Sequence, residues 1–521
     1  MHDYPGQLPY LIDGILTYGA RIGYDGPDQF ILSRNLRIEN EDWAVIDEKT
    51  SADENAGLIR QTAASFPFIS SPLGLVPKHG GGKRRIHHLS YPPGSSVNDF
   101  IEPSYGTISY CSFDDVVSSI LVAGYGCIIM KRDIRDAFRM VPVAVPHRRL
   151  LGFTWRSTSY IELALPFGLR TAPMLFNLFA EALHWILLRH GWNNLHHYLD
   201  DFIRIFPSAD AEHGAISYAS NSWVETTNQL GIPRNDLKDE LGTTVAVFGI
   251  EVDTINMTAR LPQEKVIRLR GKIEDTLADG NTTLSNIESL AGLQIFCSRV
   301  VRLGRTFTQS SFDFIAYIRR SRRWHTRHPL TPHLITDLTW WLYLLRSFNG
   351  VRLLDDNKRK VTLAFTDACD YGLGGYLVQN GVISPDFVFS FRPGLPLRKK
   401  HINAKEAASA MHIFNRWAAE LQGQRLVLYT DSATVHAGIN KGSIRGQARP
   451  YIHKLLLMAA LNDVDIICHW IPTEKNRLAD ALSRFDTTYL SRHYADLLQS
   501  LPRHTNRPLN LPTPSSHPTT S

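Results

Sequence analysis

Two adjacent carboxylates in an apolar setting constrain this chain more than any other feature. Asp200 and Asp201 lie in a Tyr-Leu-Asp-Asp run at residues 198–201, and apolar and polar residues alternate on both sides of it. This alternation predicts a β-hairpin with the two acids at its tip. Like charges side by side raise each other's pKa unless a cation separates them, and Asp oxygens are hard ligands suited to Mg²⁺. A solvated turn between two strands explains the run equally well, so other parts of the chain must decide.

Length and composition are those of a folded protein with several domains. The 521 residues exceed what one core holds, and 43% of them are hydrophobic. The net charge of +6 favours a polyanionic partner, although many proteins with this balance bind no nucleic acid. The five scattered cysteines have neither disulfide nor metal-ligand spacing. Without a secretory signal or a long apolar run, we expect an intracellular protein that does not act at a membrane, in the cytoplasm or the nucleus.

Changes of pattern divide the chain into five parts. Strand-like and helical runs alternate over 61–255, helices dominate 256–355, and alternation returns over 361–485. Residues 1–60 are an N-terminal extension, and 486–521 form a tail. The end of this tail, from about residue 502, is rich in Pro, Ser and Thr and is predicted to be disordered. In the helical part, Ser285-Asn286-Ile287-Glu288 predicts a capping box.

A third acid follows a predicted buried strand upstream of the pair. Residues 128–133 (Ile-Ile-Met-Lys-Arg-Asp) end in Asp133, which such a strand can present beside the tip of a neighbouring hairpin. Asp133, Asp200 and Asp201 would then form three convergent carboxylates. Such a set binds two divalent ions about 3.5–4 Å apart, the arrangement used for in-line phosphoryl transfer. One ion activates the attacking hydroxyl and the other neutralises the leaving pyrophosphate.

Several motifs together resemble reverse transcriptases. The palm-like motifs are residues 133–138 (Asp-Ile-Arg-Asp-Ala-Phe), 165–173 (Leu-Pro-Phe-Gly-Leu-Arg-Thr-Ala-Pro) and 198–201, in the family's order and at similar spacing. Fingers-like and primer-grip-like runs flank them, at residues 71–78, 83–86 and 247–252. The resemblance implies a right-hand polymerase with fingers and palm over 61–255 and a thumb and connection over 256–355.

The resemblance also implies the metal site of this polymerase. Asp133, Asp200 and Asp201 would be catalytic metal ligands, and the carbonyl of Ile134 would complete one coordination shell. Lys238 could match a late palm lysine of the family, but its surroundings favour a solvated lysine.

The same resemblance implies a nucleotide site. Phe138 would be a steric gate against a ribose 2′-hydroxyl, with core packing as the second explanation. Lys78 and Arg84 would hold the incoming triphosphate, and Arg85 is an alternative to Arg84 if the alignment slips by one residue. The nucleotide and template pocket would be lined by Phe167 and Gly168. Retroviral enzymes usually carry Gln in the slot of Phe167, whereas Phe is common in retrotransposon relatives.

Four further acids lie in the α/β part at 361–485. Asp367 and Asp431 each end a predicted strand, Glu406 opens a helix, and Asp480 lies near the end of the part. Singly, Asp431 could cap the next helix and Glu406 could favour a helix N-terminus. In this order the four resemble the Asp-Glu-Asp-Asp site of RNase H, where two Mg²⁺ ions activate water to cut the RNA of a hybrid. In the slot where many of these enzymes have a mobile histidine, this chain has Glu474.

The resemblances imply one function with one principal alternative. The fold would be α/β (α+β): palm, fingers and thumb followed by an RNase H-like domain. The protein would be an RNA-directed DNA polymerase with fused RNase H from a DIRS-type or Gypsy-like retroelement, using two Mg²⁺ ions per site, or Mn²⁺. Its partners would be deoxynucleoside triphosphates, an RNA template, a DNA primer and the RNA–DNA hybrid. The alternative is a catalytically inactive or domesticated relic that binds hybrids, and a templated polymerase of another class fits less well.

Overall fold

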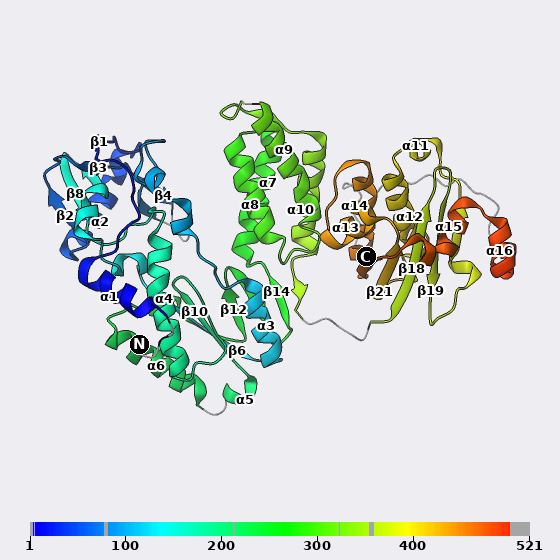
Figure 1. Cartoon of the computed structure of the whole chain (residues 1–521), viewed down its shortest axis with the longest axis horizontal. Helices are drawn as coiled ribbons and strands as arrows, with labels where there is room; N and C mark the ends of the chain where they lie inside the picture. The colour runs from blue at the N-terminus through cyan, green and yellow to red at the C-terminus, as the bar shows by residue number, and fades with distance from the viewer. Residues whose placement is uncertain are drawn as a thin grey trace. The chain divides into compact units, whose positions relative to one another are not determined.

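The computed structural model describes residues 4, 6–77, 82–211, 214–321, 323–353 and 359–500 (Figure 1). The chain divides into two compact units, residues 1–248 with 252–257 and residues 249–251 with 258–521. Both units mix helices and strands, which confirms the predicted fold class. Lys78 and the segment predicted to be disordered from about 502 lie outside the described residues.

A four-stranded antiparallel sheet lies at the centre of the first unit. Its strand order is β11-β6-β10-β9. The strands are β6 (Ile128–Asp133), β9 (Leu195–Tyr198), β10 (Asp201–Phe206) and β11 (Glu240–Gly242). Residues 202–206 of β10 are buried on both faces of the sheet. Phe202 and Phe206 pack with Phe176 of α4 (Ala172–Arg189) and Trp223 of α6 (Ala215–Gln229). This close packing holds β10 rigidly, and Asp201 is the first residue of that strand.

Among the described residues, a second sheet and four further helices complete this unit. Its order is β1-β3-β7-β8-β2, and a separate hairpin pairs β4 with β5. The bounds are β1 (Phe30–Leu32), β2 (Ile59–Thr62), β3 (Phe68–Ser70), β4 (Leu73–Pro77), β5 (Lys83–His87), β7 (Gly152–Trp155), β8 (Thr158–Glu162), α1 (Leu8–Tyr18), α2 (Trp43–Asn55), α3 (Phe113–Ala123) and α5 (Ser208–Ala211). Residues 1–60, which the sequence pattern separates as an extension, belong to this fold, because β1 pairs with β3 and Asp53 of α2 binds Arg85.

Four helices fill the first part of the second unit, as the sequence predicts. They are α7 (Gln263–Asp279), α8 (Leu284–Cys297), α9 (Gln309–Ser321) and α10 (Pro332–Ser347). The short strands of this unit are β14 (Thr258–Arg260), β15 (Asn281–Thr282), β16 (His328–Pro329) and β17 (Val351–Arg352). β12 (Thr244–Val247) belongs to the first unit, and the residues of β13 (Ile250–Asp253) are divided between the two units. The predicted capping box at Ser285 is wrong. Thr283 caps α8 by accepting from the backbone N–H of Asn286, and Glu288 instead pairs with Arg319.

The C-terminal domain is built on one five-stranded sheet of order β20-β19-β18-β21-β22. Its elements are β18 (Val361–Ala368), β19 (Leu373–Val378), β20 (Val388–Phe391), β21 (Arg425–Thr430), β22 (Asp465–Trp470), α11 (Leu395–Arg398), α12 (Ile402–Trp417), α13 (Ala433–Lys441), α14 (Arg449–Leu461), α15 (Arg477–Arg484), α16 (Thr487–His493) and α17 (Ala495–Ser500). Figure 1 shows α12, α13 and α14 on one side of this sheet and α15 and α16 on the other.

Successive side chains along the strands point to opposite faces of this sheet, and apolar side chains form a core on each face. Leu373 and Leu377 of β19 pack with α12, whereas Tyr376 packs with α15 and with Leu490 and Leu497 of the last two helices. Residues 486–500, which the sequence pattern assigns to a tail, therefore cover one face of the sheet. None of the helices in the described ranges combines the length and the apolar character that crossing a membrane requires.

Candidate active sites

The predicted hairpin is present, and it faces the third acid. β9 ends at Tyr198 and β10 begins at Asp201, so Asp200 lies in the turn between them. In the antiparallel register of β6 and β10, Asp133 is directly opposite Asp201. The backbone N–H of Ile134 donates to the carbonyl of Asp200 at 3.0 Å. Strand pairing therefore brings Asp133 beside Asp200 and Asp201, from which it is far apart in the sequence, and we refer to these three acids as the palm trio.

Two lysines contact the palm trio. Sequence reasoning did not identify Lys131, and it favoured a solvated Lys238 over the match to a late palm lysine, whereas the structure pairs Lys238 with Asp133. The Nζ of Lys238 lies 3.2 Å from Oδ1 of Asp133, and the Nζ of Lys131 lies 3.9 Å from Oδ1 of Asp201. Lys131 also pairs with Glu240 at 3.0 Å. Lys131 is two residues before Asp133 on β6, so the period of a strand could have indicated it. The contact of Lys238 depends on how the chain returns to the sheet, and no local pattern signals it.

The acids of the hairpin hold protons more readily than solvated aspartates. Burial raises the pKa of Asp201 to about 6, and the charges of Asp200 and Asp133 act in the same direction against Lys131. Burial also raises the pKa of Asp200. Desolvated carboxylates that repel one another are the setting in which a bound divalent cation is most favourable. The donor set of the palm trio therefore fits such ions.

The predicted nucleotide-binding residues meet beside one another. The ring centroids of Phe138 and Phe167 are 5.1 Å apart, and Cζ of Arg84 lies 6.0 Å from the centroid of Phe167. Arg84 is exposed, whereas the guanidinium of Arg85 is buried and donates to Asp53 at 2.6 Å. Of these two neighbouring arginines, Arg84 therefore has the more exposed side chain, and Arg85 is held in a buried ion pair.

Phe138 and Gly168 also have structural roles. Phe138 packs against the core beside α4, so the packing explanation holds whether or not it also selects the sugar. Gly168 has φ +99°, and a Cβ there would lie 2.5 Å from the carbonyl oxygen of His87. Its own carbonyl accepts from Asn98 at 2.9 Å. Only glycine fits this turn. Ile134 is buried, with 2% of its surface exposed.

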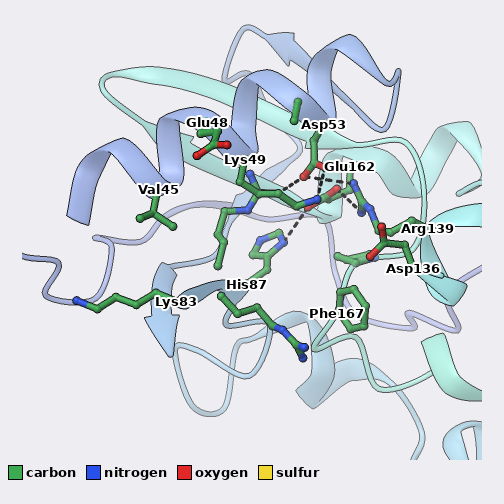
Figure 2. A pocket seen from close by; sticks show the side chains of 14 residues that line it. Val45, Glu48, Lys49, Asp53, Lys83, His87, Asp136, Arg139, Glu162 and Phe167 are labelled. Atoms are coloured by element: carbon green, nitrogen blue, oxygen red, sulfur yellow. Dashed lines mark hydrogen bonds and ion pairs between the residues drawn. The ribbon is translucent and has the colours of Figure 1, made fainter. Parts of the chain in front are cut away.

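A cavity of about 520 Å³ adjoins these residues, lined by α2, by β5 and by the loop that carries Phe167 (Figure 2). Lys49, Lys83 and Arg84 line it. Below it, Arg139 donates to Glu162 at 2.7 Å, in a buried ion pair that the sequence did not reveal. Although burial opposes ionisation, Arg139, with help from His87, lowers the pKa of Glu162 to about 2. The wall of this cavity is therefore held by fixed charges.

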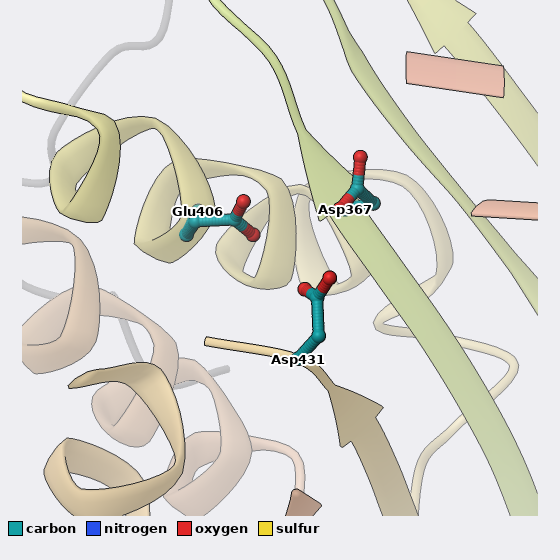
Figure 3. A group of neighbouring side chains, drawn as sticks. All are labelled: Asp367, Glu406 and Asp431. Atoms are coloured by element: carbon teal, nitrogen blue, oxygen red, sulfur yellow. The ribbon is translucent and has the colours of Figure 1, made fainter. Parts of the chain in front are cut away.

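Three acids of the C-terminal domain converge more closely (Figure 3). One carboxylate oxygen each of Asp367, Glu406 and Asp431 lies within 4.8 Å of the other two. Among the described residues, no other group of three or more Asp, Glu, His or Cys side chains brings its ligand atoms this close together. β18 and β21 are parallel neighbours with Phe365 level with Tyr429. Asp367 and Asp431, two residues beyond these partners, therefore end at the same edge of the sheet, where α12 brings Glu406. We refer to these acids as the C-terminal trio.

Electrostatics in the C-terminal trio favour a cation. Burial, together with the charges of Asp431 and Asp480 and against a hydrogen bond from Ser483, raises the pKa of Asp367 to about 7. Burial, with the charges of Asp367 and Asp431, also raises the pKa of Glu406 well above its usual range. Oε1 of Glu406 accepts from the backbone of Ala368, while its buried Oε2 has no hydrogen-bond partner among the described residues. An oxygen left in this way fits a hard metal ion.

Asp480 lies near the C-terminal trio but is turned toward another partner. Its Oδ1 is 2.5 Å from Nε of Arg484, one turn along α15. Its charge still raises the pKa of Asp367 and Glu406. Glu474 is exposed in the short turn before α15, where the neighbouring Thr473 donates to Asp431 at 2.7 Å.

Residues 83–245 match the family model described as reverse transcriptase (RNA-dependent DNA polymerase), which identifies a reverse transcriptase domain within the chain. Among solved structures, a foamy viral protease-reverse transcriptase in complex with double-stranded DNA is 16% identical, with 89% of this chain and 78% of that chain covered and a TM-score of 0.47. A foamy viral protease-reverse transcriptase in complex with an RNA/DNA hybrid is 15% identical, with coverages of 95% and 60% and a TM-score of 0.48. No curated protein matches the chain.

Proposed function

We propose that this protein is an RNA-directed DNA polymerase with a fused RNase H, which copies the RNA of a DIRS-type or Gypsy-like retroelement into DNA. The observation that carries the proposal is the pairing of Asp133 with Asp201, because the acids of two separate motifs, residues 133–138 and 198–201, then lie at one end of one sheet. These motifs lie within the segment that matches the reverse transcriptase model.

The palm trio would hold two Mg²⁺ ions, or Mn²⁺. Bound there, the ions would activate the primer hydroxyl and neutralise the charge of the leaving pyrophosphate. Asp133 and Asp201 face each other across the two central strands, so the rigid sheet fixes their separation. The exposed Lys238 can swing away from Asp133, since 64% of its side chain is accessible to solvent.

The residues around the cavity would bind the incoming deoxynucleoside triphosphate. Arg84 offers a guanidinium to the phosphates, Phe167 supports it, and Phe138 would stand against the ribose 2′-hydroxyl. Lys78, Ile134 and Gly168 complete the proposed nucleotide site, with Gly168 shaping the turn that exposes Phe167.

The C-terminal trio, with Asp480, would form the RNase H site. Its acids retain a proton near pH 7, because like charges are held together in a desolvated place. A divalent cation would displace that proton and activate water to cut the RNA of the hybrid. Rotation of Asp480 away from Arg484 would add a fourth carboxylate to this set.

Primer extension on an RNA template tests the polymerase proposal. We expect DNA synthesis in Mg²⁺ that Asp201→Asn reduces by at least about a thousandfold, because the substitution removes a metal ligand. The control Asp114→Asn changes an exposed acid of α3 in the same unit and should leave synthesis unchanged. Synthesis that survives Asp201→Asn at the normal rate would refute the assignment.

A further inference from the structure

A second cavity, whose lining includes none of the palm trio or C-terminal trio acids, lies within the second unit. It has a volume of about 650 Å³ and lies between α10 and α14, with Phe307 of the turn before α9 in its wall. This volume falls in the range of about 300–1,000 Å³ that is typical of small-molecule sites. An ion pair of 2.6 Å between Asp337 and Arg449 joins the two helices at its edge, which keeps its walls in place.

Aromatic side chains form one side of this cavity. The ring centroids of Phe307 and Trp340 lie 5.6 Å apart, and those of Phe307 and His453 lie 5.2 Å apart. Trp340 is half-buried, so part of its indole remains free to contact a ligand. The Phe307–Trp340 pair is tilted and the Phe307–His453 pair is edge-on, and an aromatic wall that is partly open in this way favours a planar ligand.

A buried polar atom in the wall lacks a partner. Nε2 of His453 makes no hydrogen bond to any described residue, although it is out of contact with solvent. Burial, together with the charge of Arg449, lowers the pKa of His453 to about 3, so its imidazole is neutral at physiological pH. A neutral imidazole nitrogen can accept or donate one hydrogen bond, and a buried one is stabilised when a ligand supplies the partner.

The charge lining the cavity is positive. Lys400, Arg449 and Lys454 line it, against the single acid Asp337. Arg449 is committed to Asp337, and the Nζ of Lys400 donates to the hydroxyl of Tyr451 at 3.2 Å. Burial lowers the pKa of Lys454, but the basic side chains of the lining still outnumber its single acid, which favours an anionic ligand.

We propose that this cavity binds a nucleotide, which combines a planar heteroaromatic base with a phosphate. The base would stack on Trp340, its polar edge would meet Nε2 of His453, and the phosphate would face Lys400 and Lys454. A purely apolar ligand would leave His453 without a partner, and inorganic phosphate would not use the aromatic wall. The nucleotide is either free or an unpaired unit of a nucleic acid strand, because both present the same groups. This binding site is additional to the two proposed activities and does not depend on them.

Calorimetric titration of the full chain with adenosine monophosphate in EDTA tests the proposal, since EDTA removes metal-dependent nucleotide binding. We expect one bound equivalent, and we expect Trp340→Leu to weaken binding by at least about tenfold, as loss of a base–aromatic stack does. His453→Phe keeps a ring but removes the hydrogen bond, so it should also weaken binding. The matched control Trp324→Leu changes an exposed tryptophan outside the cavity and should leave affinity unchanged.

Two further ligands define what is recognised. Adenosine, which lacks the phosphate, should bind more weakly than the monophosphate, and inorganic phosphate should not compete. A tetranucleotide of RNA that displaces the monophosphate would assign the site to an unpaired unit of a strand, whereas failure to displace it would assign the site to the free nucleotide. The proposal is overturned if the monophosphate does not bind the wild-type chain. It is also overturned if Trp340→Leu and His453→Phe, both folded by their thermal unfolding, bind it as well as wild type does.

Discussion

The palm trio and the C-terminal trio each hold three acidic side chains close together, but their negative charge is compensated in different ways. In the palm, Lys131 and Lys238 lie beside the acids as internal cations. In the C-terminal trio the compensation comes from retained protons, since the pKa of Asp367 rises to about 7 and that of Glu406 rises too. The pKa of Asp201 is also raised, to about 6, so the contrast lies in the lysines. A bound divalent ion would displace ammonium groups as well as a proton in the palm, but only protons in the C-terminal trio, so the two sites should respond differently to substitution and to pH.

The largest expected effect is the separation of the two activities. Asp431→Asn should reduce cleavage of the RNA strand in a hybrid by at least about a thousandfold while DNA synthesis stays within about twofold of wild type. Cleavage and extension of one doubly labelled hybrid would measure both. Asp386→Asn, an exposed acid of the same domain, is the control. Loss of both activities in Asp431→Asn would contradict two independent sites.

The second effect concerns stability against pH. The raised pKa of Asp367 means that the folded state holds a proton that the unfolded state has released, so stability falls as pH rises from about 4 to about 7. Asp367→Asn removes this loss. The free energy of unfolding of the variant should therefore gain up to about 4 kcal/mol on wild type between pH 4 and pH 8 in the absence of divalent ions.

Thermal unfolding at several pH values, with and without Mg²⁺, would measure this difference. Mg²⁺ should stabilise the wild-type chain at pH 8 and have little effect on the C-terminal transition of Asp367→Asn. A constant difference between the two chains across this range of pH would show that protons do not compensate the C-terminal trio.

The third effect distinguishes two neighbouring arginines. Arg84→Ala should raise the KM for deoxynucleoside triphosphates about tenfold through a lost charge-assisted contact, with the thermal unfolding midpoint unchanged. Arg85→Ala should instead lower that midpoint by several degrees, because Asp53 would lose a buried partner. Steady-state kinetics and thermal unfolding of both variants would check this. The reverse pattern would exchange their roles.

The smallest effect tests the internal cations of the palm. Lys238→Met removes the ammonium group from Asp133 and should lower the Mg²⁺ concentration for half-maximal synthesis by up to about fivefold, since Lys238 is largely exposed. Lys441→Met, which changes an exposed lysine at the end of α13, is the control. A higher Mg²⁺ requirement in Lys238→Met would mean that the lysine helps metal binding rather than competing with it.

Strand ends were predictable from the sequence, but their electrostatic partners were not. Alternating patterns located Asp133, Asp200 and Asp201, because a strand's period and its last residue are local properties. The contact between Lys238 and Asp133 spans 105 residues and depends on tertiary packing. The ion pair between Arg139 and Glu162 was hidden for the same reason, since it joins the turn after β6 to the end of β8.

Errors at element ends also have physical reasons. Thr283 and Ser285 are both residue types that cap helices, and Thr283 is the cap in the structure. Helix α8 therefore begins at Leu284, before the predicted cap at Ser285. Residues 1–60 lack a strong pattern, because β1 is three residues long and takes its place only by pairing with β3. The sequence assigns residues 486–500 to a tail because they have few apolar side chains. Those side chains, Leu490 among them, become buried only by packing on the sheet, which a local pattern does not reveal.

The most direct test of two separate metal-binding sets of acids is a crystal structure of the protein grown with Mn²⁺, with the ions located by anomalous scattering. The account predicts Mn²⁺ at two places, one between Asp133 and Asp201 with Lys238 displaced, and one among Asp367, Glu406 and Asp431. If Lys238 still contacts Asp133 at saturating Mn²⁺, and no ion lies between Asp133 and Asp201, the account is contradicted.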